Sequence, residues 1–234
     1  MRTPKTIDVL IRSPRRGRGF WFSVAIDLIW VLVALATRLR WSGKEHLPRK
    51  GGVLVASNHL SMVDPIPVTA FVLAARRIPR YLAMAELWKA PVIKWVVAGG
   101  KHIPVERRST RAVQALHGMV DAVGAGECVV VFPEGGIGRQ SDHWPEPKVK
   151  NGVARVALES KAPVIPVAIW GSHELLPADT KKLKLRPRKT IQVVAGPPVE
   201  LSDLYDAPRT KTTLDEATKR IMAAITEQLA TLRG

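Results

Sequence analysis

The stretch Gly51-Gly-Val-Leu-Val-Ala-Ser-Asn-His59-Leu-Ser-Met-Val-Asp64-Pro65 decides how the rest of the chain is organised. Val53 to Ala56 form a short apolar run of β-branched character after a glycine pair, which predicts a buried strand. Asp64 and Pro65 predict the start of a helix, because aspartate is a favoured N-cap residue and proline fits the first helical position. His59 therefore follows the end of a strand, and Asp64 stands where the next helix begins.

Four residues separate His59 from Asp64, so the loop between them can fold the carboxylate back toward the imidazole. A histidine oriented by a carboxylate is a general-base arrangement, because the carboxylate fixes the tautomer and stabilises the imidazolium that forms. The spacing by itself is common by chance, and a capping aspartate beside an unrelated loop histidine is the alternative interpretation. The rest of the chain favours the general-base interpretation, since it repeats the pattern of a strand followed by a polar loop.

Length and composition fit one α/β domain with an appendage. The chain has 234 residues, 46% of them hydrophobic, which excludes a disordered protein. Its net charge of +16 requires an anionic partner, which could be nucleic acid, an anionic membrane or a phosphorylated substrate. The single cysteine, Cys128, excludes an intramolecular disulfide and a cysteine metal cluster. It lies in an apolar run, which predicts a buried core thiol.

Two segments precede the main domain. Residues 1–19 carry six Lys or Arg against one acidic residue, and we interpret them as a basic arm. We assign residues 20–41 to a membrane-associated segment whose apolar helix runs from Phe20 to Ala36. As a helix that run spans only about 25 Å, short of a hydrocarbon core of about 30 Å. Asp27 near its centre adds a few kcal/mol to a spanning pose, so the segment is a poor simple span.

We favour a helix that lies in, or dips into, one leaflet from the cytoplasmic side of the cell membrane. Basic residues flank the run on both sides, and Trp21, Trp30 and Trp41 are distributed along it. A secretory signal peptide is disfavoured, because the residues after Ala36 contain no small-residue cleavage site. A single span and a helix packed wholly on the protein remain as alternatives.

Strands and helices are expected to alternate through residues 42–234. The patterns predict strands over 53–56, 80–84, 102–105, 128–132, 162–170 and 190–195. They predict helices over 65–75, 87–98, about 110–123, 151–160 and from Thr213, where a capping box with Glu216 opens a terminal helix. This alternation indicates an α/β fold, with a central mostly parallel sheet covered by helices on both faces and ligands at the strand ends.

Four blocks of the sequence resemble those of the glycerolipid acyltransferase family. They are Asn58-His59-Leu-Ser-Met-Val-Asp64, Ile103-Pro-Val-Glu-Arg107, Phe132-Pro-Glu134-Gly135 and Val164-Ile-Pro-Val-Ala168. Their order and spacing match the family, and the chain most resembles the bacterial 1-acylglycerol-3-phosphate acyltransferases. The resemblance covers roughly residues 45–200.

The resemblance implies transfer of a fatty acyl group from a carrier thioester to a glycerophospholipid hydroxyl, with His59 as base and Asp64 orienting it. It implies that Arg107 grips the acceptor phosphate, and that Glu134 and Gly135 serve acceptor binding and support of the site. We also expect Asn58 to contact the substrate. No bound cofactor or metal is expected. Acyl-CoA or acyl-ACP would be the co-substrate. The expected partners are lysophosphatidic acid, an anionic membrane surface and acyl carrier protein, and we expect no binding of nucleic acid.

One departure from the family pattern leaves the acceptor head group open. The third block often continues with Thr or Ser and then Arg, whereas here Gly136, Ile137 and Gly138 precede Arg139. Arg139 could take over that basic role. Another lysophospholipid or a glycosylated acceptor is therefore an alternative, and a non-enzymatic basic protein that binds nucleic acid or membrane is a third. The basic run over residues 181–189 could touch anionic head groups or be a solvated loop.

Overall fold

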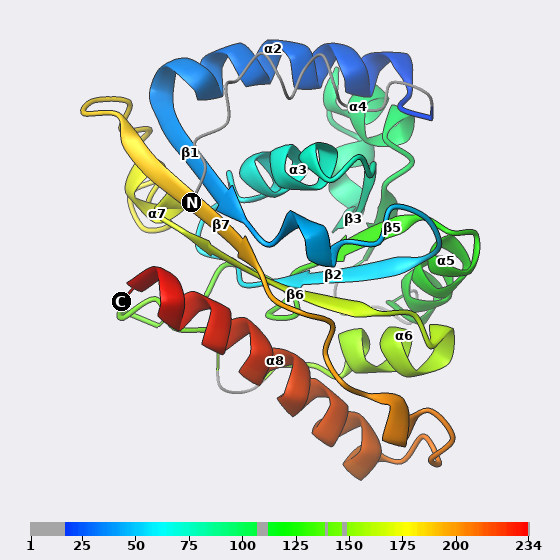
Figure 1. Cartoon of the computed structure of the whole chain (residues 1–234). Helices are drawn as coiled ribbons and strands as arrows, with labels where there is room; N and C mark the ends of the chain where they lie inside the picture. Colours follow the sequence, from blue (N-terminus) through cyan, green and yellow to red (C-terminus); the bar gives the residue numbers. More distant parts are fainter. Residues whose placement is uncertain (1–16, 107–111, 139, 147–148, 234) are drawn as a thin grey trace.

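A seven-stranded sheet forms the centre of the protein, which the computed structural model describes over residues 17–106, 112–138, 140–146 and 149–233 (Figure 1). The strands lie in the order β1-β7-β6-β2-β5-β3-β4. Their bounds are β1 Thr37–Ser42, β2 Val53–Ser57, β3 Pro79–Met84, β4 Ile103–Val105, β5 Cys128–Val131, β6 Val164–Trp170 and β7 Lys189–Ala195. Neighbouring strands pair in parallel except β6 with β7. The expected mostly parallel α/β sheet is confirmed.

Helices cover both faces of the sheet (Figure 1). They are α2 Phe20–Ala36, α3 Pro65–Ala74, α4 Ile93–Gly99, α5 Ala112–Gly124, α6 Gly152–Ser160, α7 Ser172–Leu175 and α8 Lys211–Arg233, with the 3-10 helices η1 Lys44–His46, η2 Ala85–Trp88 and η3 Ser202–Leu204. Val55 of β2 packs with Phe71 of α3 on one face, whereas its neighbour Leu54 packs with α5, α6 and α8 on the other. The central strands are therefore apolar on both sides, which explains their continuous hydrophobic sequence.

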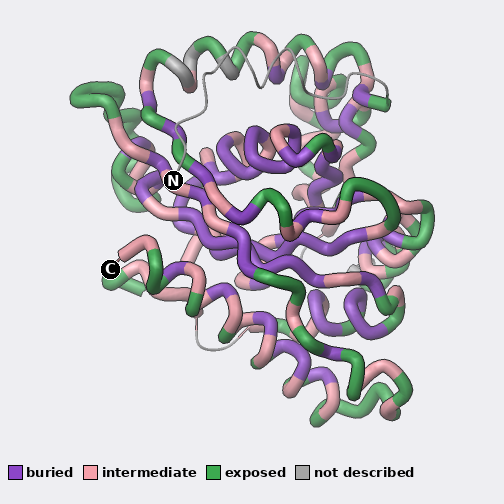
Figure 2. The backbone as a smooth tube through the Cα atoms, in the orientation of Figure 1, coloured by how far each residue is buried: buried purple, intermediate pink, exposed green. Residues whose placement is uncertain are grey.

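Helix α2 forms a further layer outside α3. Phe22 and Ile26 are buried against Leu73 of α3, while the opposite side of α2 is exposed along its length (Figure 2). Across the ranges that the structure describes, no helix combines the length and the apolar character needed to cross a bilayer.

The apolar helix ends at Ala36 as expected, but residues 37–41, which we assigned to the membrane-associated segment, are not part of it. Residues Thr37–Ser42 form β1 instead, paired in parallel with β7. Leu39 and Trp41 are buried in the core and Arg38 and Arg40 are exposed, so this run has the two-residue alternation of an edge strand. The boundary of the α/β domain therefore lies before residue 42, and our prediction on this point was wrong.

Two expected helices also differ from the structure. The helix predicted over 87–98 is divided into η2 and α4, because Pro91 cannot donate a backbone hydrogen bond and Val92 has a φ of +64°. Helix α8 begins at Lys211, and Thr210 accepts the hydrogen bond of the Thr213 N–H at 3.2 Å. The predicted capping box is therefore wrong. The apolar face predicted for this helix is confirmed as buried: Leu214, Ile221, Ile225 and Leu229.

The carboxyl ends of β2, β3, β4 and β5 meet at one edge of the sheet, because these strands are parallel. β2 lies directly beside β5. The loops that follow these two strands are therefore neighbours, and they carry the candidate site.

Candidate active site

His59 and Asp64 are in direct contact beyond the end of β2. The Nδ1 atom of His59 lies 2.9 Å from Oδ2 of Asp64. The same oxygen accepts hydrogen bonds from the backbone N–H groups of Leu60 at 2.6 Å and Ser61 at 2.8 Å. Asp64 is fully buried, whereas the side chain of His59 is 15% exposed. The structure thus brings together the two residues that the sequence pairs.

The Asp64 carboxylate determines which nitrogen of His59 is basic. An ionised carboxylate only accepts hydrogen bonds, so Nδ1 carries the ring proton and Nε2 keeps its lone pair. Within the described residues Nε2 makes no hydrogen bond. The arrangement can therefore take a proton from a hydroxyl group that reaches the exposed edge of the ring.

Asp64 does not cap α3, contrary to our expectation. Its backbone is helical, with φ −54° and ψ −37°, and its side chain makes no capping hydrogen bond. The carboxylate instead turns back into the loop, where His59 and two backbone N–H groups of residues 60 and 61 surround it. These three donors outcompete the helix terminus for the carboxylate.

Phe132 supports the other side of the imidazole. Its ring stacks on His59 with centroids 4.2 Å apart and an interplanar angle of 20°. Tyr81 of β3 stacks in turn on Phe132 at 6.3 Å. Asp64 thus fixes the edge of the imidazole and Phe132 fixes its face. We assigned no role to Phe132 from the sequence, although it opens the third block.

Glu134 joins the loops after β2 and β5. Its carboxylate accepts hydrogen bonds from the backbone N–H of His59 at 2.8 Å and from that of Glu146 at 3.2 Å. Burial raises the pKa of Glu134, and its hydrogen bond from the His59 backbone opposes that rise. Gly138 adds a second link, because its N–H donates to the carbonyl of His59 at 2.8 Å. Glu134 therefore holds His59 in place, and both carboxylate oxygens are engaged with the backbone.

Asn58 and Gly135 are also placed differently from our expectation. The Asn58 side chain is fully buried, donates to the Ile169 carbonyl at 3.0 Å and accepts from the Ile169 N–H at 2.8 Å. It therefore extends the pairing of β2 with β6 and cannot touch a substrate. Gly135 has a φ of +69°, and its N–H donates to the carbonyl of Phe132 at 2.9 Å. Gly135 thus shapes a tight turn, and this N–H is not free for an oxyanion.

Arg107 and Arg139, the two candidate phosphate ligands, lie outside the described residues. Strand β4, which precedes Arg107, ends at Val105, and this end lies at the same edge of the sheet as His59.

A cluster of aromatic rings lies at the end of β6, formed by His143, Trp170 and His173. The rings of His143 and His173 are 4.3 Å apart, and Trp170 is 4.5 Å from His173. From the sequence we expected neither histidine to have a clustered partner, and the structure shows that this is wrong. The pKa of His173 is lowered to about 4, mainly by burial and in smaller part by His143 and Arg233, while Asp64 opposes this. His143 and His173 are thirty residues apart, so no local pattern predicts their contact.

Two other titratable groups are structural. His102 accepts a hydrogen bond from the Tyr81 N–H at 3.3 Å, and burial and Arg80 lower its pKa to about 4. Cys128 is buried in the core, which raises the pKa of its thiol to about 12 and confirms the prediction of an inert cysteine.

The described residues contain no group of three or more His, Cys, Asp or Glu that could hold a metal ion. A cavity of about 400 Å³ lies between β4 and α5, with Ile103, Pro104 and Ala115 in its lining. None of its lining residues belongs to the His59 loop or to the loop after β5, so we assign it no part in the chemistry.

Comparisons with known proteins show which family and fold the chain resembles. The family model described as Acyltransferase matches residues 38–170. A 1-acyl-sn-glycerol-3-phosphate acyltransferase of Bacillus subtilis is 27% identical over 89% of this chain and 92% of its own length. Its namesake from Borreliella burgdorferi is 26% identical over 56% of this chain and 51% of its own length. The crystal structure of the 1-acyl-sn-glycerophosphate acyltransferase from Thermotoga maritima is similar in fold, with a TM-score of 0.65, 21% identity, and coverage of 98% of this chain and 80% of that one.

Proposed function

Because the chain belongs to the acyltransferase family, we propose that it transfers a fatty acyl group from an acyl thioester to the free hydroxyl of 1-acylglycerol-3-phosphate, which gives phosphatidic acid in phospholipid biosynthesis. The observation that carries the proposal is the contact of 2.9 Å between His59 and Asp64 at the strand edge. The names of the Bacillus and Borreliella relatives support the choice of acceptor.

In this proposal His59 is the general base and Asp64 positions it. Nε2 of His59 takes the proton of the acceptor hydroxyl as its oxygen attacks the thioester carbonyl carbon. The tetrahedral intermediate then collapses, the carbon–sulfur bond breaks, and the imidazolium returns the proton to the leaving thiolate. Asp64 stabilises the imidazolium between the two steps. A thioester is already activated, so no acyl-enzyme is required.

Arg107 is proposed to bind the acceptor phosphate, because a guanidinium offers a rigid fork of donors that matches phosphate oxygens. The order of the strands supports this role. β4 lies three strands from β2 in the sheet, a distance of about 14 Å at roughly 4.8 Å per strand. A glycerol phosphate and an arginine side chain together can bridge much of that distance. Arg139 is proposed as an additional cation for the same head group.

We further propose that α2 lies on the cytoplasmic leaflet of the cell membrane, where a lipid acceptor is found. Phe20 is 71% exposed and Leu35 is 70% exposed, at the two ends of the helix, and Trp21, Leu28 and Val31 between them are also exposed. The opposite side of the helix is apolar as well and packs on α3. Apart from Ser23 and Asp27 the helix is apolar, so its exposed side needs a second apolar environment, and a lipid leaflet provides it.

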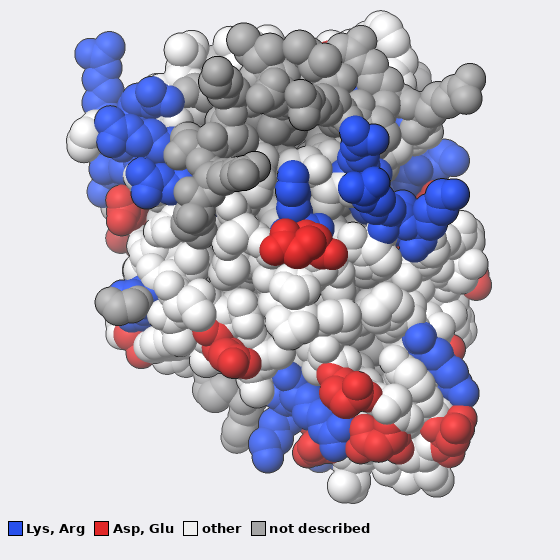
Figure 3. Space-filling view, in the orientation of Figure 1, with Lys and Arg blue, Asp and Glu red and all other residues white. Residues whose placement is uncertain are grey.

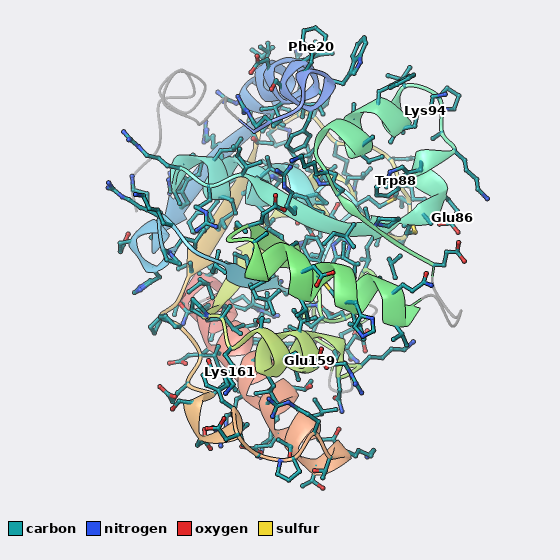
Figure 4. All side chains as sticks on the ribbon, turned by 90° about the vertical axis from the view of Figure 1, so that its right-hand side faces the viewer. Phe20, Glu86, Trp88, Lys94, Glu159 and Lys161 are labelled. Carbon is teal, nitrogen blue, oxygen red and sulfur yellow. The ribbon has the colours of Figure 1, made fainter. Side chains whose placement is uncertain are left out.

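Helix α4 extends this apolar surface. The N–H of Gly19, directly before α2, donates to the carbonyl of Gly99 at 3.0 Å, so the start of α2 contacts the end of α4. Val92, Ile93 and Trp95 are exposed at α4. Figure 4 shows Phe20 and Lys94 at the same end of the molecule, whereas Glu159 and Lys161 lie toward the opposite end.

The altered third block keeps one other acceptor class open, namely a different lysophospholipid or a glycolipid. The donor is proposed as acyl-CoA or acyl-ACP. A panel of acceptors and donors decides between them: purified protein is incubated with each pair, and release of the free thiol is measured. We expect lysophosphatidate to be consumed fastest. Consumption of only a different lysolipid would assign the second acceptor class.

The catalytic role of His59 is tested by His59→Ala, with His117→Ala as the matched control, because His117 is exposed on α5. We expect His59→Ala to abolish thiol release while its circular dichroism spectrum stays unchanged, and His117→Ala to keep full activity. Normal turnover by a folded His59→Ala protein would overturn the proposed mechanism.

A further inference from the structure

The loop between α7 and β7 combines exposed cations with exposed leucines. Five Lys or Arg lie among residues 176–188 against a single acidic residue, Asp179. Leu183 is 57% exposed and Leu185 is 48% exposed, and both stand among the basic residues of the run. Large apolar side chains that lie in water beside several cations are typical of a segment that contacts an anionic lipid surface.

The position of this loop is fixed relative to α2. The guanidinium of Arg188 donates to the carbonyl of Thr37, the residue directly after α2, at 2.7 Å. Thr37 is also the register partner of Lys189 in the pairing of β1 with β7. Within the loop, the N–H of Lys184 donates to the carbonyl of Leu175 at 2.8 Å. The loop is therefore attached to the C-terminal end of the apolar helix.

The surroundings of the loop add to its positive charge. Arg38 and Arg40 are exposed on β1, and Leu35 is exposed in the last turn of α2. Figure 1 shows the loop at the upper left, beside the end of α2, and Figure 3 shows Lys and Arg side chains gathered on that side of the molecule. One side of the protein thus presents an apolar helix bordered by cations.

We propose that residues 181–188 are a second membrane contact, whose cations bind the head groups of anionic phospholipids while Leu183 and Leu185 enter the lipid interface. This inference rests on the proposed position of α2 at a membrane, and it adds a preference for anionic lipid. The loop and α2 together make two separate contacts with one leaflet, which fixes how the protein is oriented above it.

The test is sedimentation of the full chain with vesicles of phosphatidylcholine, or of phosphatidylcholine mixed with an equal part of phosphatidylglycerol. The charge variant is Lys182→Gln/Lys184→Gln/Arg186→Gln. Its control is Lys161→Gln/Lys211→Gln/Lys219→Gln, which removes the same charge from α8 and from the end of α6, where all three side chains are exposed.

We expect the charge variant to bind the mixed vesicles at least about tenfold more weakly than the control variant, because each cation near an anionic surface adds to the affinity. Binding to pure phosphatidylcholine should be the same for both. Raising the salt concentration from about 0.1 M to 1 M, which shortens the screening length from about 10 Å to 3 Å, should remove the difference. Leu183→Ser/Leu185→Ser should weaken binding to both kinds of vesicle.

Equal binding of the charge variant and its control to the mixed vesicles would overturn the proposal. Binding to a small acidic protein, such as an acyl carrier protein, is measured as well. The proposal would also be overturned if the charge variant bound that protein more weakly than its control but bound both kinds of vesicle equally well. Activity in detergent micelles is measured in parallel and should be unchanged in all of these variants. A wild-type protein without acyltransferase activity would refute the proposed function, while the vesicle comparison would still decide the role of the loop.

Discussion

Replacing Asp64 by Asn tests the proposed catalytic pair with the smallest change of shape. In the folded protein one oxygen of Asp64 accepts three hydrogen bonds, from His59 and from the N–H groups of Leu60 and Ser61. An asparagine must turn its oxygen toward these three donors, because its amino group there would face other N–H groups. The imidazole would then keep its orientation and lose the negative charge beside it.

The loss of that charge sets the expected magnitude. Two unit charges about 4 Å apart attract by about 4 kcal/mol at an effective dielectric constant of about 20. This attraction is gained only when His59 becomes an imidazolium, and about 1.4 kcal/mol corresponds to a tenfold change in rate. We therefore expect Asp64→Asn to lower kcat by about 100- to 1,000-fold. KM should hardly change, since Asp64 is fully buried and cannot touch the acceptor.

The assay is thiol release from an acyl thioester with lysophosphatidate, measured at several acceptor concentrations to separate kcat from KM. Asp206→Asn is the matched control, because Asp206 is exposed and pairs with Lys161 far from His59 in the sequence and on the other side of the fold. A folded Asp64→Asn protein whose kcat lies within about tenfold of the wild type would refute the reasoning, since the charge would then contribute less than about 1.4 kcal/mol.

Three further predictions concern the support of the site and its pH dependence. Gly138→Ala would place a Cβ atom 2.8 Å from Oε2 of Glu134, whose two carboxylate oxygens each accept a hydrogen bond from a backbone N–H. We therefore expect stability to fall by about 1–2 kcal/mol in thermal melts and activity to fall by about tenfold in thiol assays. Asn58→Ala leaves the N–H and carbonyl of Ile169 without partners and should lower the free energy of unfolding by about 2–4 kcal/mol in urea titrations, and a loss below about 0.5 kcal/mol would contradict this. The pKa of His102 is lowered from 6.5 to about 4 mainly by burial, so the unfolded chain binds more protons and the free energy of unfolding decreases, by at most about 3 kcal/mol, as the pH falls from 6.5 to 4. His102→Gln should remove this part of the slope when urea titrations are repeated at several pH values, and an unchanged slope would show that other groups cause it.

Local patterns predicted much of the fold. The apolar runs of β2, β5 and β6 are buried on both faces of the sheet, as their continuous hydrophobic sequence indicates. The face of α8 that carries Leu214 and Ile221 is buried as its helical spacing predicts. β1 was not predicted, because the alternation of Arg38, Leu39, Arg40 and Trp41 directly follows an apolar helix and is only four residues long.

The candidate site, too, was predictable from the sequence only in part. The contact of His59 with Asp64 was predictable, because a loop of four residues can fold the carboxylate back to the imidazole and the other three blocks favoured that arrangement. Glu134 was recognised as a member of a block that supports the site, but the group that it holds could not be predicted. Its partner is the backbone of His59, 75 residues away, and only the pairing of β2 with β5 brings them together.

The sequence by itself determined the alternation of strands and helices, the pairing of His59 with Asp64 and the basic character of residues 181–189, since each depends on residues that are close in the chain. Only the tertiary structure decided that Phe132 stacks on His59, that Asn58 is hydrogen-bonded to the backbone of Ile169, and that the basic loop is attached to the end of α2. These contacts depend on the order of the strands in the sheet. That order is set by the packing of the whole core, which no local pattern in the sequence records.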